Sequence, residues 1–149
     1  MNRREVLLGV AAMAASATAS KAFAAGHEHD HMNMAHDHKS AINEKLIAVA
    51  ADCALKANIC VQHCIVLMGQ GEKDLAACAN SSSQAAAICT ALQQLASAES
   101  KQLPQLAKVA MDVCKACEDE CRKSERHPEC KACKEACVAC YEECRKIAA

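Results

Sequence analysis

Aromatic side chains are almost absent from this 149-residue chain, which contains one tyrosine, one phenylalanine and no tryptophan. A hydrophobic core must therefore be built from leucine, valine, isoleucine, alanine and cysteine. Base-stacking platforms for nucleic acid are excluded for the same reason, and no block of basic residues provides a phosphate-binding surface. The formal charge is near zero, with 17 basic and 18 acidic residues. At this length we expect one domain and no nucleic-acid partner.

Strand-like alternation of polar and apolar residues is also lacking, whereas apolar residues recur at helical spacing. Helical segments are expected at about 40–69, 72–98, 104–124 and 128–147. Gly69 and Gly71 end the first segment, while Pro104 and Pro128 start the third and the fourth. Short connections between helices of this length favour an all-α fold, namely an antiparallel four-helix bundle with a cysteine-lined core.

The first 24 residues have the features of an export signal. Arg3-Arg4 precedes an apolar, alanine-rich run that is too short for a membrane span. Ala22-Phe23-Ala24 provides a small-x-small cleavage site. The paired arginines resemble a twin-arginine signal, with an ordinary secretory signal as the alternative. We therefore expect an exported, periplasmic protein, preferably one that crosses the membrane already folded.

A biased tail at residues 25–39 follows the signal and contains five histidines and two methionines. Imidazole and thioether groups both bind copper, so one interpretation is a weak metal-capture segment. The other interpretation is a solvated leader. The bundle itself is expected to occupy residues 40–149.

Cysteine, by contrast, is abundant, with 13 residues, and the last expected helix shows the pattern best. Its five cysteines follow steps of three, four, three and four, which is the spacing of an inward-facing helix seam. The same kind of seam runs through the other three segments. The candidate metal ligands are Cys53, Cys60, Cys64, Cys78, Cys89, Cys114, Cys117, Cys121, Cys130, Cys133, Cys137, Cys140 and Cys144.

Levels matched along an antiparallel bundle bring these thiols into one column. Counting outward from the two loops gives four matched levels: Cys53 with Cys89, Cys64 with Cys78, Cys114 with Cys140, and Cys121 with Cys133. Closure of the bundle puts the last helix beside the first, so that their cysteines face each other. All 13 sulfur atoms are therefore expected in one core column.

Four cysteine pairs are separated by four residues, at 60/64, 117/121, 133/137 and 140/144. On a helix such side chains have Cβ atoms roughly 5–6 Å apart, whereas a disulfide needs roughly 3.5–4.5 Å. The pairs suit an ion held between two sulfurs, and soft thiolates select Cu(I) or zinc. Structural zinc requires four tetrahedral ligands, so the row of thiols favours multiple Cu(I) ions per chain. A zinc or cadmium thiolate buffer and a disulfide-linked scaffold are the alternatives.

The two ends of the expected bundle differ in chemistry. One end is apolar and collects Leu46, Leu92, Leu95, Leu103, Leu106 and Ile147. The other end collects Cys64, Cys78, Cys121 and Cys130, with His63, Met68 and His127 nearby. We expect metal to enter at this second end, with His63 and Met68 as additional ligands. His127 is expected in a loop.

Catalytic groups are not evident in the sequence. No Ser/His/Asp set or pair of acids can be assembled, and His63 has no evident orienting acid. We therefore expect no enzyme and no organic cofactor.

Together these motifs resemble the bacterial copper storage proteins, in particular their exported branch. The resemblance covers essentially the whole chain. Its motifs are Cys60-x-x-His63-Cys64, Cys78, Asp112-Val113-Cys114-x-x-Cys117-x-x-x-Cys121, and Glu129-Cys130 through Cys144. It implies a homotetramer of four-helix bundles that stores many Cu(I) ions, mostly on two thiolates each. It also implies delivery to a copper enzyme or chaperone, or detoxification.

One departure from the family concerns the metal-entrance end. The exported relatives carry several methionines after the Cys-x-x-His-Cys motif. Here Leu67, Gln70 and Leu75 stand in that region, and only Met68 remains nearby. His63 is the ligand at this end that the resemblance carries over most directly.

Overall fold

The computed structural model describes residues 38–148. The expected signal at 1–24 and nearly all of the expected tail at 25–39 lie outside this range. The described part consists of α1 (His38–Gly69), a 3-10 turn η1 (Lys73–Leu75), α2 (Ala76–Ser97), α3 (Leu103–Arg122) and α4 (Pro128–Ile147). It contains no strand. The all-α prediction is therefore confirmed.

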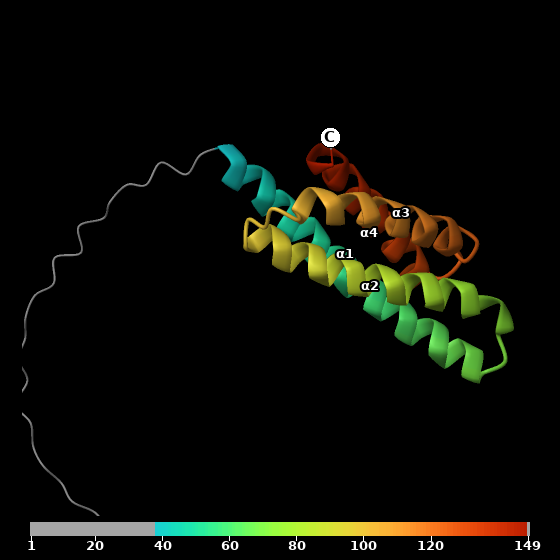
Figure 1. Cartoon of the computed structure of the whole chain (residues 1–149). Helices are drawn as coiled ribbons and strands as arrows, with labels where there is room; N and C mark the ends of the chain where they lie inside the picture. The colour runs from blue at the N-terminus through green and yellow to red at the C-terminus, as the bar shows by residue number, and fades with distance from the viewer. Residues whose placement is uncertain (1–37, 149) are drawn as a thin grey trace, which may run out of the picture. The chain divides into compact units, whose positions relative to one another are not determined.

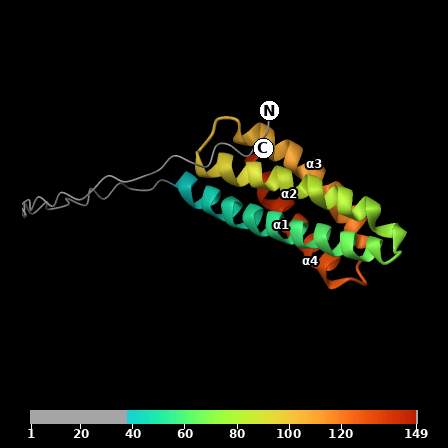
Figure 2. The ribbon, with the colours of Figure 1, turned by 90° about the horizontal axis from the view of Figure 1, so that it is seen from below.

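The four helices lie side by side as an elongated bundle (Figures 1 and 2). α1 lies along α2, α2 along α3 and α3 along α4, while α4 closes the bundle against α1. Short connections reverse the chain after each helix, which is the up-and-down topology of a four-helix bundle. The predicted antiparallel bundle is confirmed, and it places the inner faces of all four helices around one core.

A glycine sets the end of α1. The amide of Glu72 donates to the carbonyl of Leu67 at 3.0 Å, and the amide of Gly71 donates to the carbonyl of Met68 at 3.1 Å. These two bonds form the Schellman arrangement that satisfies the last carbonyls of a helix. Gly71 has φ 104°, a conformation that side chains with a Cβ rarely adopt. The turn η1 then brings Leu75 into the core, so α2 begins at Ala76 rather than near residue 72.

The apolar end of the bundle is as expected from the sequence. Leu46, Leu92 and Leu103 are buried, and Leu95, Leu106 and Ile147 pack against them. This cluster separates the cysteines from solvent at one end.

The inner seam differs from the prediction at three positions. Helical spacing of the large apolar residues predicts Val49, Leu67 and Leu106 on the inner face, but all three are half-buried, whereas Ala50 and Ala107 are fully buried. On α1 the fully buried positions step by four, three, four, three and four from Leu46 to Cys64. This step pattern requires position 50 rather than 49, because a helix seam in a bundle repeats every 3.5 residues.

An apolar row remains exposed on the outside of α1. It consists of Leu55, Ile59, Ile65 and Val66, which are 55%, 43%, 50% and 57% exposed. We call it the α1 outer row. The segment Asn43–Gly69 is long and apolar enough for a membrane span by composition alone, with mean hydropathy 1.2. Its inner face forms the bundle core, so only the outer row lacks a partner among the described residues.

Candidate metal centre

All thirteen cysteines lie inside the bundle as free thiols, and each is at most 2% exposed. Every helix contributes to this sulfur column, and α4 contributes most, with five cysteines. The helices hold them in place because each thiol occupies a position where a bundle normally buries leucine. The buried column expected from the sequence is therefore present, although its role as a ligand set stays a prediction.

The column can be described as four layers perpendicular to the helices, numbered from the apolar end. Layer 1 contains Cys53, Cys89, Cys114 and Cys140, whose Sγ atoms all lie within 4.8 Å of one another. Layer 2 contains Cys117 and Cys137, which lie within the same limit, and the register places Ala57 and Ala85 opposite them. Layer 3 contains Cys60, Cys121, Cys133 and Ser82. Layer 4 contains Cys64, Cys78 and Cys130. Cys144 lies one turn beyond layer 1. All four matched levels predicted from the sequence are found.

The layers are in direct contact with one another. Cys53 Sγ of layer 1 lies 3.7 Å from Cys137 Sγ of layer 2. Cys117 Sγ of layer 2 lies 3.7 Å from Cys133 Sγ of layer 3. Cys60 Sγ lies 3.6 Å from Cys130 Sγ of layer 4. The sulfur column is therefore continuous.

The sulfur spacing suits metal ions held between thiolates. The Sγ atoms of Cys60 and Cys64 are 4.0 Å apart, and those of Cys117 and Cys121 are 3.8 Å apart. With a metal–sulfur bond of about 2.3 Å, two thiolates on opposite sides of one ion lie about 4.6 Å apart. Small side-chain rotations are therefore enough to admit an ion between such pairs.

The thiols have unequal affinities for protons. Hydrogen bonds from Cys114 and then Cys137 lower the pKa of Cys53 from 9.0 to about 6. Burial, followed by repulsion from Cys60, raises the pKa of Cys64 to about 12. Neutral thiols pack as small apolar groups, whereas thirteen bare thiolates could not be buried without cations. The metal-free core therefore keeps most of its protons, which a bound metal must displace.

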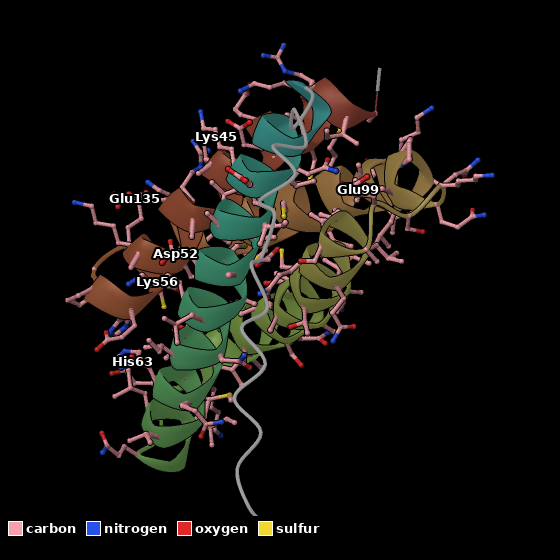
Figure 3. All side chains as sticks on the ribbon, turned by 90° about the vertical axis from the view of Figure 1, so that its left-hand side faces the viewer. Lys45, Asp52, Lys56, His63, Glu99 and Glu135 are labelled. Carbon is pink, nitrogen blue, oxygen red and sulfur yellow. The ribbon has the colours of Figure 1, made fainter. Side chains whose placement is uncertain are left out.

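The open end beyond layer 4 carries a histidine pair. The rings of His63 and His127 have centroids 5.0 Å apart. His63 Nδ1 lies 3.4 Å from Oε2 of Glu129, and His127 Nε2 lies 3.6 Å from Oε2 of Glu72. Figure 3 shows His63 on α1 directed toward the start of α4. His63 Nε2 is buried and has no hydrogen-bond partner among the described residues, so it is available for a metal.

These contacts correct one expectation and refine another. The sequence suggested no orienting acid for His63, but α4 begins beside α1 and brings Glu129 to it. His127 was expected in a loop; it is the residue before α4 and packs on His63. Met68 is half-buried against the core near this end. Arg126 donates to Glu72 at 2.9 Å and completes the charged rim.

Sequence reasoning missed Ser82, which is fully buried among the thiols of layer 3. The available signal was its position four residues after Cys78 on the inner face of α2. It was obscured because Ser82 belongs to a run of three serines, which resembles a polar surface.

Such a cysteine-filled bundle, with one apolar end and one histidine-lined end, defines a class of soft-metal-binding helical proteins. The family profile described as copper storage protein matches residues 36–149, and the chain belongs to this family. The copper storage protein 3 of Bacillus subtilis in its Cu(I)-bound form is similar, with a TM-score of 0.67 and 30% identity over 72% of this chain and 99% of that chain. The apo form has a TM-score of 0.63 and 30% identity over 71% and 98%. A comparison with curated proteins found no match.

Proposed function

We propose that this protein stores several Cu(I) ions per chain on the thiolates of the sulfur column. The observation that carries the proposal is the sharing of sulfurs between neighbouring sites. Cys60 belongs to one group with Cys64, Cys78 and Cys130 and to another with Cys121 and Cys133. Cys133 likewise joins two groups. Only the four cysteines of layer 1 offer four thiols that no other group uses, as a separate tetrahedral zinc site requires, whereas soft Cu(I) accepts few thiolates per ion.

The similarity to a Cu(I)-bound relative supports the same metal. This chain covers 99% of that relative at 30% identity, so the bundle is matched as a whole. Each Cu(I) ion that replaces thiol protons also supplies the positive charge that a buried thiolate needs. Storage of many ions is therefore compatible with a neutral, folded, empty bundle.

The proposed cellular location and assembly of the protein rest on residues outside the bundle core. The expected signal at 1–24 supports export to the periplasm, preferably by the twin-arginine route, which would protect the thiols from oxidation until the bundle has folded. The apolar α1 outer row supports assembly of several chains, and the family resemblance favours a homotetramer. A copper enzyme or chaperone would then take ions from the open end. In this proposal the protein is a store and has no catalytic role.

Native mass spectrometry of the reduced mature protein, titrated with Cu(I), tests the proposal. We expect a series of species with increasing numbers of bound Cu(I) ions. At saturation this number should be well above the number of ions that tetrahedral, zinc-like coordination allows. One ion per four thiols would give about three ions per chain. Uptake of only one or two ions would show that the protein is not a store. Loss of free thiols in the denatured, non-reduced protein would favour the disulfide scaffold instead.

A further inference from the structure

Ser82 is the only member of layer 3 that is not a cysteine. Its side chain is fully buried, and its Oγ atom lies close to sulfur atoms from α1, α3 and α4. The distances from Oγ to Sγ are 3.5 Å for Cys60, 3.6 Å for Cys117, 3.6 Å for Cys121 and 3.7 Å for Cys133. A hydroxyl thus stands in the middle of the sulfur column.

The position of Ser82 on α2 is that of a ligand. It follows Cys78 by four residues, just as Cys64 follows Cys60 on α1. α3 and α4 carry thiol pairs with the same spacing, so α2 is the one helix whose pair is completed by a hydroxyl. One ligand position of the column is therefore held by oxygen.

The chemistry of a hydroxyl differs between the empty and the loaded column. A serine hydroxyl has one proton to donate and two lone pairs that accept. In the empty column it can donate to one thiol and accept from others. Copper displaces the thiol protons, after which the surrounding thiolates can only accept. A neutral, hard oxygen is also a poor ligand for Cu(I).

We propose that Ser82 occupies a ligand position without binding copper, and instead donates a hydrogen bond to a copper-bound thiolate of layer 3. Such a bond draws electron density from the sulfur and weakens its bond to the ion. Layer 3 then holds its copper less tightly than a layer of thiolates alone would. The inference rests on the Cu(I) storage proposed above.

The first test replaces Ser82 by alanine. Alanine is a good helix former and already lines layer 2 at Ala57 and Ala85, so the fold is retained. S82A should bind as many Cu(I) ions as the unmodified protein. Part of its copper should pass to a chromophoric Cu(I) chelator more slowly, by a few-fold up to about tenfold, because a donor to the thiolate is gone. Ser83 is exposed on the same helix turn, and S83A provides the matched control.

The second test replaces Ser82 by cysteine, which completes the thiol pair on α2. S82C should take up about one more Cu(I) per chain in a native mass spectrometry titration, whereas S83C adds a thiol outside the column and should not. Transfer rates of S82A equal to those of S83A, or no added capacity in S82C, would overturn the role of Ser82 while the unmodified protein still loads fully. Failure of the unmodified protein to load would instead overturn storage itself.

Discussion

His63 Nδ1 lies 3.4 Å from Oε2 of Glu129. This contact links α1, where His63 precedes Cys64, to the first turn of α4, where Glu129 precedes Cys130. The carboxylate favours an orientation of the imidazole with Nδ1 toward α4, although Oε2 of Glu129 has no hydrogen-bond partner among the described residues. Nε2 of His63 also has no hydrogen-bond partner among the described residues and is the nitrogen that can bind a passing ion.

This arrangement predicts the effect of removing the imidazole. H63G should slow Cu(I) loading and release while the number of ions bound at saturation stays the same, because the thiols are intact. The rates are measured by exchange with a chromophoric Cu(I) chelator. Gln62 is exposed on the same turn, so Q62G controls for the effect of glycine on the helix. E129Q should slow exchange less than H63G. Equal rates in H63G and Q62G would argue against a role for His63 in copper transfer.

The raised thiol pKa values predict how the empty bundle responds to alkali. The pKa of Cys64 is raised from 9.0 to about 12, and hydrogen bonds with Cys140 and with Cys60 raise the pKa values of Cys144 and Cys130 in the same direction. Between pH 9 and 12 the folded chain keeps protons that the unfolded chain loses, so the free energy of unfolding falls as pH rises. Thiols with a lowered pKa, such as Cys53, are already deprotonated in both states there and add no slope.

Thermal unfolding of the reduced, metal-free protein, followed by circular dichroism, measures this effect. The midpoint should drop on going from pH 8 to pH 10.5. The copper-loaded protein has no such protons to lose and should change much less. A metal-free midpoint that holds or rises over this range would contradict the prediction.

The apolar end should matter for stability and not for copper capacity. Leu92 is fully buried there, and L92A should lower the free energy of unfolding by about 2–5 kcal/mol through lost burial and a cavity. Val109 on α3 is 50% exposed, and V109A should change the free energy of unfolding by no more than about 0.5 kcal/mol. Denaturant titration gives both values. Copper bound per folded chain should be the same in both variants, and a reduced capacity in L92A would show that this end also holds metal.

The α1 outer row predicts where copies of the chain meet. Ile59 lies within this row at 43% exposure, and I59K should reduce the molar mass measured by light scattering during size-exclusion chromatography. V109K places the same charge on an exposed valine of α3 and should leave the mass unchanged. If I59K retains the mass of the unmodified protein, the row is not the interface. A monomeric unmodified protein would end the homotetramer proposal.

The register of the cysteines could be predicted because it depends on local rules alone. Cys53 and Cys89 are equally distant from the turn at Gly71, and Cys114 and Cys140 from the turn before Pro128, so an antiparallel bundle must bring each pair together. The seam repeat then fixes which face each helix presents to the core. The same logic failed at Val49, where the larger side chain seemed the better core residue than Ala50.

Ser82 was overlooked, whereas Glu129 could not be recognised from the seam at all. Ser82 fits the seam four residues after Cys78, but it stands in a run of three serines, and α2 also carries alanine on its outer face, as at Ala76 and Ala87. The contact between Glu129 and His63 depends on where the loop places the first turn of α4, which no repeat specifies. Both are polar groups fixed by helix placement rather than by burial of apolar area.

Layer 2 offers only two sulfurs, because the register sets Ala57 and Ala85 opposite Cys117 and Cys137. With leucine closing the far end, an ion at Cys144 would have to pass this layer, where only two thiols are available to it. Ions would then leave the column in the reverse order of their arrival, so that the last ion to enter is the first to depart. A partly emptied chain would keep the ions farthest from the open end, which are released slowly, whereas the ions near His63 are released rapidly.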